Sequence, residues 1–119
     1  MKNHKELTVW QKSIELVKEV YRLVKKLPKE ETYALSDQMR RAVVSIPSNI
    51  AEGNARESEK DFLRFLSIAQ GSNAELETQL LICVQLGYLT NDEIQPALIL
   101  SEETAKMLRA LIKKLKANS

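Results

Sequence analysis

The chain has 119 residues, a formal net charge of +2 from 18 basic and 16 acidic side chains, and 44% hydrophobic residues. This length suits one domain with its own core, and three glycines and three prolines are too few for a disordered or low-complexity chain. The single cysteine, Cys83, excludes an intramolecular disulfide, and residues 1–12 contain no apolar signal-peptide region. The longest apolar run, Leu80 to Val84, is too short to span a membrane. We therefore expect a cytoplasmic protein.

The first helix is predicted at about 8–27, where Thr8 followed by Gln11 has the form of a capping box. Its apolar residues form two rows with spacings of three and four: Trp10, Ile14, Val17, Tyr21 and Val24, and beside them Leu16, Val20, Leu23 and Leu27. A helix packed on one side of a small bundle needs about three apolar positions in seven. Either this helix is deeply buried in its own bundle, or the additional row faces another subunit.

The second helix is predicted at about 34–55, after a break at Pro28, because a residue before proline is pushed out of the α region. Pro47 lies inside its apolar face and leaves the carbonyl of Val43 without its usual donor, at a cost of around 3 kcal/mol in a regular helix. We expect a kinked but continuous helix, in which polar neighbours such as Ser45 and Asn49 satisfy the freed backbone groups.

The third helix is predicted at about 58–86 and the fourth at about 91–116. Ser58 offers a cap for the third helix, and Thr90 with Glu93 forms a capping box for the fourth. Gly87 is expected to end the third helix as a C-cap, and Gly71 to permit the close approach of a neighbouring helix. The turn between the second and third helices is expected near Gly53.

Four helices joined by short loops run up and down beside one another. We therefore predict an all-α protein, an antiparallel up-down-up-down four-helix bundle that occupies residues 1–119 as a single domain. Its ends are expected to fray at about 1–6 and 117–119.

No catalytic constellation is visible in the sequence. His4 is the only histidine and lies in the segment expected to fray, so a metal site or a general base has no positioned imidazole. Cys83, between Ile82 and Val84, is interpreted as a packing residue rather than a nucleophile. We expect no enzymatic activity, no metal and no cofactor.

One polar stripe follows the second helix opposite its apolar face, at spacings of three and four. It contains Arg41, Ser45, Asn49, Glu52 and Arg56. The ordinary interpretation is a solvated surface. The alternative is a network between helices or subunits that involves Glu75 or Glu77, since arginine and glutamate satisfy each other's hydrogen bonds. Catalysis is the least favoured interpretation.

Two basic stripes place four positive charges each on one helical face. They contain Lys18, Arg22, Lys25 and Lys29, and Lys106, Arg109, Lys113 and Lys116. They indicate nonspecific binding of RNA or DNA through phosphates, because the chain has few aromatic residues on which bases would stack. The alternative is an ordinary surface, since Glu15, Glu19, Glu102 and Glu103 lie within helical reach of the stripes.

Four segments carry a resemblance to a known family: LTVWQKSIELV at 7–17, LPKEETYALSDQMRRAVVSIPSNIAEG at 27–53, SEKDFLRFLSIAQGSNAELETQL at 58–80 and LGYL at 86–89. They resemble the bacterial four helix bundle family, whose members include the proteins encoded in intervening sequences of 23S ribosomal RNA genes and carry an old ribosomal-protein label. The accessory proteins of diversity-generating retroelements are similar in fold.

The resemblance implies an antiparallel four-helix protomer that assembles into a ring of five, a homopentamer, without catalytic residues. The retroelement accessory proteins resemble a basic pentamer that binds a reverse transcriptase and nucleic acid, but they carry more positive charge than this chain. Two hypotheses remain: a non-enzymatic oligomer that binds RNA or DNA, and an oligomeric scaffold that binds only protein.

Overall fold

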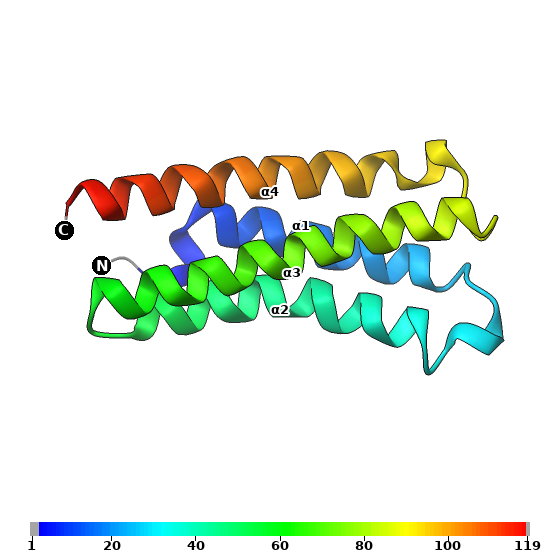
Figure 1. Cartoon of the computed structure of the whole chain (residues 1–119), viewed down its shortest axis with the longest axis horizontal. Coiled ribbons are helices and arrows are strands. Elements are labelled where there is room, and N and C mark those ends of the chain that lie inside the picture. The colour runs from blue at the N-terminus through cyan, green and yellow to red at the C-terminus, as the bar shows by residue number, and fades with distance from the viewer. Residues whose placement is uncertain (1–2, 119) are drawn as a thin grey trace.

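The computed structural model describes residues 3–118 and contains four long helices and, within those residues, no strand (Figure 1). The helices are α1 (Thr8–Val24), α2 (Leu35–Ala55), α3 (Glu59–Gln85) and α4 (Asn91–Ala117). Two 3-10 turns, η1 (His4–Glu6) and η2 (Lys29–Glu31), precede α1 and α2. The bundle is elongated, with extents of 46 × 24 × 20 Å. The predicted all-α, four-helix fold is confirmed, and α2, α3 and α4 begin and end within one residue of the predicted positions.

Each helix packs against two others, as in the four corners of a square. The adjacent pairs are α1 with α2, α2 with α3, α3 with α4, and α1 with α4, and over residues 3–118 no Cα atoms of a diagonal pair lie within 8 Å of each other. Lys26, just past the end of α1, pairs with Glu93 in the first turn of α4, whereas Lys12 in the first half of α1 pairs with Glu103. The end of α1 therefore lies beside the start of α4, and the last turns of α4 lie at the opposite end of the bundle, where α3 begins (Figure 1).

One of the two apolar rows of α1 supplies the core. Leu16, Val20 and Leu23 are fully buried, and each buried aliphatic side chain stabilises the fold by roughly 1.5–3 kcal/mol. The other row is only partly covered: Trp10, Ile14 and Val17 are half-buried, Tyr21 is exposed, and Val24 alone is buried. Other fully buried large side chains come from α2, α3 and α4: Met39, Val43, Ile46, Ile50, Leu66, Leu76, Leu80, Ile94 and Leu108.

Both ends of α1 differ from the prediction. Leu7, not Thr8, is the N-cap, and the Gln11 side chain donates to the carbonyl of Lys5 at 2.8 Å instead of completing a capping box. At the other end the α-helix stops at Val24 rather than residue 27, and tighter turns continue to the residue before Pro28. Residues 4–6 form η1 rather than a frayed end, while residues 1, 2 and 119 lie outside the described part of the chain.

The second helix runs without interruption through Pro47, as predicted. The Asn49 side chain donates to the carbonyl of Ser45 at 2.8 Å, so it satisfies a backbone group other than the carbonyl of Val43, which the sequence singled out. The proline itself is buried against the bundle. The kink at this position stays a prediction.

Gly53, and not Gly71 as expected, is the glycine at which a neighbouring helix approaches closely. A side chain at Gly53 would place its Cβ 2.7 Å from Phe65 Cβ and 2.9 Å from Phe62 Cδ1, so this glycine, inside α2, permits the close approach of α3. Gly71 is exposed, and an added Cβ there would meet nothing within 4 Å. The prediction that Gly71 accommodates a neighbouring helix is therefore wrong within the protomer, because the close contact occurs at the α2–α3 turn.

The remaining helix ends agree with the sequence. Ser58 Oγ accepts a hydrogen bond from the backbone N–H of Asp61, and Thr90 and Glu93 form a complete capping box. At the end of α3, Gly87 adopts a φ of 77°, and the N–H of Tyr88 bonds to the carbonyl of Cys83 at 2.9 Å, the pattern of a Schellman motif. Within residues 3–118, no helix combines the length and apolar character needed to cross a membrane.

Candidate nucleic-acid interface

The α4 stripe, defined as Lys106, Arg109, Lys113 and Lys116, lies on the outer side of α4 toward α3 and is exposed along its whole length. Three of its members line a surface hollow of about 470 Å³ together with Gln70 of α3 and Ile112. Within the described residues, Lys106, Arg109 and Lys113 have no carboxylate within 4.0 Å. These cations are therefore available to an anionic ligand.

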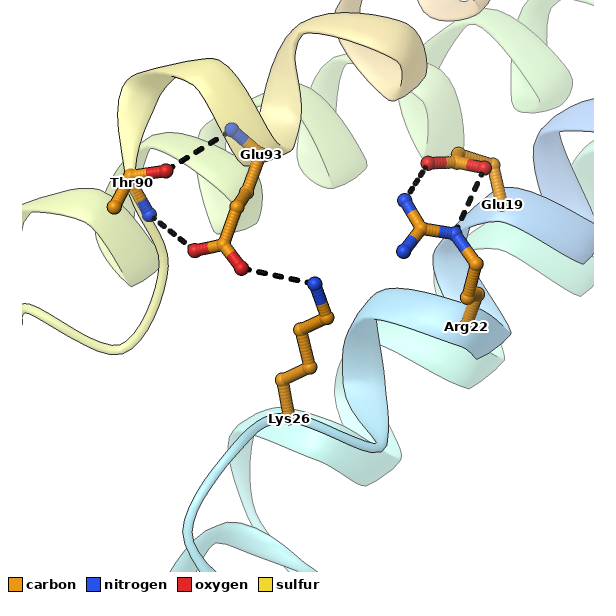
Figure 2. Close-up of polar contacts among 5 residues, drawn as sticks. All are labelled: Glu19, Arg22, Lys26, Thr90 and Glu93. Atoms are coloured by element: carbon orange, nitrogen blue, oxygen red, sulfur yellow. Dashed lines mark hydrogen bonds and ion pairs between the residues drawn. The ribbon is translucent and has the colours of Figure 1, made fainter.

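The α1 stripe, defined as Lys18, Arg22, Lys25 and Lys29, is also exposed. Arg22 is engaged by Glu19 one turn earlier, and this hydrogen bond raises the pKa of the arginine (Figure 2). The other three members have no carboxylate within 4.0 Å in the described part of the chain. One charge of this stripe is thus compensated and three are not.

Three of the four acidic neighbours that favoured an ordinary surface form no ion pair with a stripe member within residues 3–118. Glu15 and Glu103 both pair with Lys12, at 3.5 and 3.7 Å, and Lys12 belongs to neither stripe. Glu102 forms no ion pair within residues 3–118, so Glu19 is the one acidic neighbour in that range that reaches a stripe. Helical reach along the sequence therefore overstated how far the stripes are neutralised.

The structure does not bring the two stripes together. The pair of Lys26 and Glu93 holds the end of α1, with its stripe, beside the first turn of α4. The α4 stripe begins more than three turns later and lies at the end of the bundle where α3 starts (Figure 1). A single protomer therefore presents two separate basic surfaces rather than one continuous path for a nucleic-acid strand.

A small polar network joins the α1 stripe end to α4 (Figure 2). Lys26 Nζ donates to Glu93 Oε2 at 2.9 Å, and the other carboxylate oxygen accepts the backbone N–H of Thr90 at 2.9 Å. The hydrogen bond from Lys26 and the hydrogen bonds with Thr90 hold the pKa of Glu93 below its ordinary value. This network joins the end of α1 to the first turn of α4.

The polar stripe of α2 (Arg41, Ser45, Asn49, Glu52 and Arg56) is mainly satisfied within its own helix. Arg41 pairs with Asp37, and Arg56 pairs with Glu52, at 2.9 and 2.8 Å. Toward α3, the hydroxyl of Ser45 lies 2.8 Å from that of Ser72, and Arg56 lies over the ring of Phe65, whereas no ion pair with Glu75 or Glu77 forms within residues 3–118. Both arginines are exposed, so the stripe is a solvated surface within the protomer, with one hydrogen bond to the next helix.

Two arginines that the sequence did not connect lie over the same aromatic ring. The guanidinium carbons of Arg56 and Arg64 are 5.0 and 4.4 Å from the centroid of Phe65. Cation–π contacts of this kind stabilise exposed sites by about 0.5–1 kcal/mol. The two cations are thereby positioned at the α2–α3 turn, although no spacing rule along the chain would have indicated their convergence.

The residues considered for catalysis hold packing positions. Cys83 is fully buried, its Sγ lies 3.6 Å from Met39 Sδ, and burial raises its pKa to about 11, so the thiolate nucleophile is scarce. His4 stacks edge-on against Trp10 at 5.2 Å between ring centroids, rather than in a frayed segment. Across residues 3–118 no three histidine, cysteine or acidic side chains gather in a way that holds a metal ion.

An apolar surface was only partly anticipated. Trp10, Ile14 and Val17 of α1 line a hollow of about 310 Å³ with Val44 and Pro47 of α2. On α3 a further row is exposed, with spacings of three and four, and the apolar pattern of this helix predicted only its core positions. It contains Ile68, Gly71, Glu75, Thr78, Ile82 and Leu86. Its signal in the sequence is the repeat of isoleucine at 68 and 82, two heptads apart.

Comparison with known proteins gives a family and a fold. The family model described as 23S rRNA-intervening sequence protein matches residues 5–110. A crystal structure of a protein with unknown function from the S23 ribosomal protein family of Bacteroides thetaiotaomicron is similar, with a TM-score of 0.82 and 31% sequence identity. The similarity covers 89% of this chain and 99% of that one. No curated protein matches the sequence.

Proposed function

Because this chain belongs to the 23S rRNA-intervening sequence protein family, we propose that it is a non-enzymatic oligomer that binds RNA or DNA through basic helix faces. The observation that carries the proposal is the set of exposed cations on α4, Lys106, Arg109 and Lys113, without carboxylate partners in the described chain. Backbone phosphates are the ligand that such a row of cations recognises. The cytoplasmic location expected from the sequence stays a prediction.

The proposed assembly is a homopentamer of antiparallel four-helix protomers, with the number five taken from the family resemblance. Assembly matters for binding because five copies of a chain with net charge +2 carry +10 together. Repeating one row of cations around a ring also raises the effective concentration of each row for a bound strand. The half-buried apolar row of α1 supports a subunit contact, since a monomer would leave it in contact with water.

Recognition through phosphates predicts little sequence preference. The residues that line the α4 hollow include no aromatic ring, so the bases have no surface on which to stack there. Cations that contact phosphates position a nucleic acid without distinguishing its bases. We therefore expect similar affinities for RNA strands of unrelated sequence.

The second candidate is an oligomeric scaffold that binds only protein, and the exposed apolar side chains on α1, α2 and α3 favour it. Fluorescence anisotropy with a labelled RNA strand and a labelled DNA duplex at 50 mM salt separates the two candidates. Nucleic-acid binding predicts a saturable rise for the wild type and a large loss for Arg109→Glu with Lys113→Glu. A matched control, Lys5→Glu with Arg41→Glu, changes the net charge equally at exposed positions outside both stripes.

Three results would count against the proposal, the first against nucleic-acid binding itself and the other two against the α4 stripe as its site. The wild type would fail to bind at 50 mM salt, the α4 reversal would bind as tightly as the wild type, or the control reversal would lose as much affinity as the α4 reversal. The third result would assign binding to net charge alone and not to the α4 stripe. The double variant Lys113→Glu with Lys116→Glu, compared with the wild type in the same titration, tests the end of the α4 stripe in the last turns of the helix.

A further inference from the structure

The first observation is an unfilled apolar surface between α1 and α2, called here the α1–α2 groove and formed by Trp10, Ile14, Val17, Val44 and Pro47. Val44 is 39% exposed, and Tyr21, one turn beyond Val17 in the same row, is 41% exposed. A single exposed apolar side chain is ordinary, whereas a contiguous apolar patch indicates an interaction site. Here five side chains from two helices lie together and line one surface hollow.

The second observation is the α3 row, formed by Ile68, Gly71, Glu75, Thr78, Ile82 and Leu86. Its apolar members are exposed, with Ile82 at 39% and Leu86 at 55% exposure. Nothing lies within 4 Å of the position a Cβ would occupy at Gly71, so the middle of the row allows another helix to approach closely. The α3 row has the same spacing of three and four as the apolar row of α1 that begins at Trp10. Side chains with this spacing form the ridges by which one helix packs into the grooves of another.

The third observation is that the charges beside these two surfaces are opposite. Lys18 and Lys25 follow Ile14 and Tyr21 by one turn on α1 and have no acidic partner in the described residues. Glu75 lies in the middle of the α3 row, is exposed, and pairs with no cation over residues 3–118. Complementary charges at the rim of an apolar contact favour the correct register of two docked surfaces.

We propose that the α3 row of one copy docks into the α1–α2 groove of a second copy, with Glu75 facing the α1 lysines. The proposal rests on the oligomer proposed above and specifies its contact. The two surfaces differ, so the contact is heterologous and each copy offers one of each. A heterologous contact forms a closed ring when its rotation divides a full turn, and it forms a filament when it does not. The proposed homopentamer requires a rotation that closes after five copies.

This contact assigns different roles to the two basic stripes. Lys18 follows the groove residue Ile14 by one turn and faces the neighbouring copy, and Lys25 lies two turns further along α1, beside Tyr21. The α4 stripe belongs to neither surface and remains open to an anionic ligand in the assembled ring. Nucleic-acid binding therefore depends on α4, whereas assembly depends on α1, α2 and α3.

The test uses one substitution in each surface, made at positions of equal exposure so that the protomer still folds. Val44→Glu places a charge in the groove, and Ile82→Glu places a charge in the α3 row; both side chains are 39% exposed. Ile99→Glu is the matched control, because Ile99 is 53% exposed on α4 and belongs to neither surface. Native mass spectrometry of the untagged full chain gives the assembly state, and circular dichroism checks that each variant is helical.

The expected results follow from the heterologous geometry. The wild type and Ile99→Glu form closed rings, and Val44→Glu and Ile82→Glu are each monomeric. An equimolar mixture of the two monomeric variants forms a dimer that contains one of each, because the intact row of one fits the intact groove of the other. A two-fold symmetric contact would not give this result. In such a contact each subunit contributes the same surface, so every pair would include a substituted residue on both sides.

Several outcomes would overturn the proposal. If the wild type is oligomeric and either variant stays assembled, the proposed contact between row and groove is wrong, and the proposal that the protein is an oligomer is unaffected. If both variants are helical monomers but their mixture forms no dimer at concentrations up to about 100 times those that assemble the wild type, the pairing of row with groove is wrong. A monomeric wild type would overturn the proposed oligomer as well, and binding of RNA by that monomer would leave the nucleic-acid proposal in place.

Discussion

Lys26 and Glu93 join the end of α1 to the start of α4, with 2.9 Å between Lys26 Nζ and Glu93 Oε2 (Figure 2). The same carboxylate completes the capping box with Thr90, so one side chain both caps a helix and holds its neighbour. Exposed ion pairs alone contribute little to stability. Thr90→Ala removes the hydroxyl that caps α4 and should lower the free energy of unfolding by about 1 kcal/mol. The cap therefore contributes more to stability than the ion pair alone.

The first prediction concerns the pH dependence of this network. Its hydrogen bonds lower the pKa of Glu93 from 4.5, so the folded state favours the charged form. The stability that these hydrogen bonds supply is present above the pKa that Glu93 has in the unfolded chain. It is lost as the pH falls through the lower pKa that Glu93 has in the folded protein. We expect the thermal midpoint of the wild type to fall more than that of Glu93→Gln on acidification from neutral pH to about pH 3. Equal falls in both proteins, followed by circular dichroism, would exclude this role.

The second prediction contrasts two glycines. Replacing glycine by alanine inside a helix normally stabilises it by about 1 kcal/mol. Gly53→Ala should instead destabilise the protein, because the new Cβ would lie 2.7 Å from Phe65 Cβ, and overpacking of this kind costs about 1–3 kcal/mol. Gly71→Ala should be stabilising, since its Cβ would meet no atom within 4 Å.

Urea unfolding measures both free energies. The comparison is made in the Ile82→Glu background, so that a contact between copies at Gly71 does not contribute. A stabilised Gly53→Ala would mean that α2 and α3 separate there at little cost. A destabilised Gly71→Ala in that background would contradict the open surroundings of this position.

The third prediction concerns a buried polar pair between α3 and α4. Asn73 Nδ2 donates to the carbonyl of Ser101 at 2.9 Å, and Ser101 Oγ donates to Asn73 Oδ1 at 2.8 Å. Ser101→Ala leaves the buried Asn73 oxygen without its donor, which should cost about 1–3 kcal/mol. In a double-mutant cycle with Asn73→Ala, we expect the two losses to be less than additive by at least about 0.5 kcal/mol. Additive losses in urea unfolding would show that the pair does not act as a unit.

The fourth prediction concerns the reactivity of Cys83. Burial raises its pKa to about 11, so near neutral pH the thiol is protonated and shielded from reagents. Reaction with a chromogenic disulfide reagent should be slow in the folded protein and fast in urea. An added Ile99→Cys supplies an exposed thiol that should react at once in the same folded protein. Rapid reaction of Cys83 under native conditions would contradict its packing role.

The sequence predicted where the helices begin and end better than it predicted which of their residues contact other helices. Local signals fixed the caps at Ser58, Thr90 and Gly87, because each depends on residues within one turn. The capping box at Thr8 failed because the Gln11 side chain bonds instead to η1, which the pattern did not anticipate. Which glycine meets a neighbour could not be read from spacing, since it depends on where two helices touch.

The candidate site shows the same limit. Periodicity identified the members of each basic stripe correctly as exposed cations, but it overstated their neutralisation, because Glu15 and Glu103 both reach Lys12. The relative position of the two stripes was not predicted, because it depends on how α1 and α4 lie beside each other, which the pair of Lys26 and Glu93 shows. The α3 row could not be separated from ordinary surface by sequence alone, since three of its six members are not apolar.

The last prediction concerns salt. If about six phosphates are neutralised, affinity should fall roughly a thousandfold between 50 and 200 mM salt. Removing one phosphate contact should weaken binding to all sequences alike and lower the slope of log affinity against log salt by about one. We therefore expect Arg109→Gln and Lys113→Gln each to lower this slope equally for two RNAs of unrelated sequence, while Lys5→Gln leaves it unchanged.

Anisotropy titrations over this salt range measure the slope, and native mass spectrometry of each variant checks that the assembly is intact. A variant that remains assembled but loses affinity with an unchanged slope would have altered something other than a phosphate contact. A loss confined to one of the two RNAs would indicate that Arg109 or Lys113 reads bases, although no aromatic ring lines the hollow they share with Gln70. Either result would replace phosphate recognition on α4 by a base-specific or indirect role.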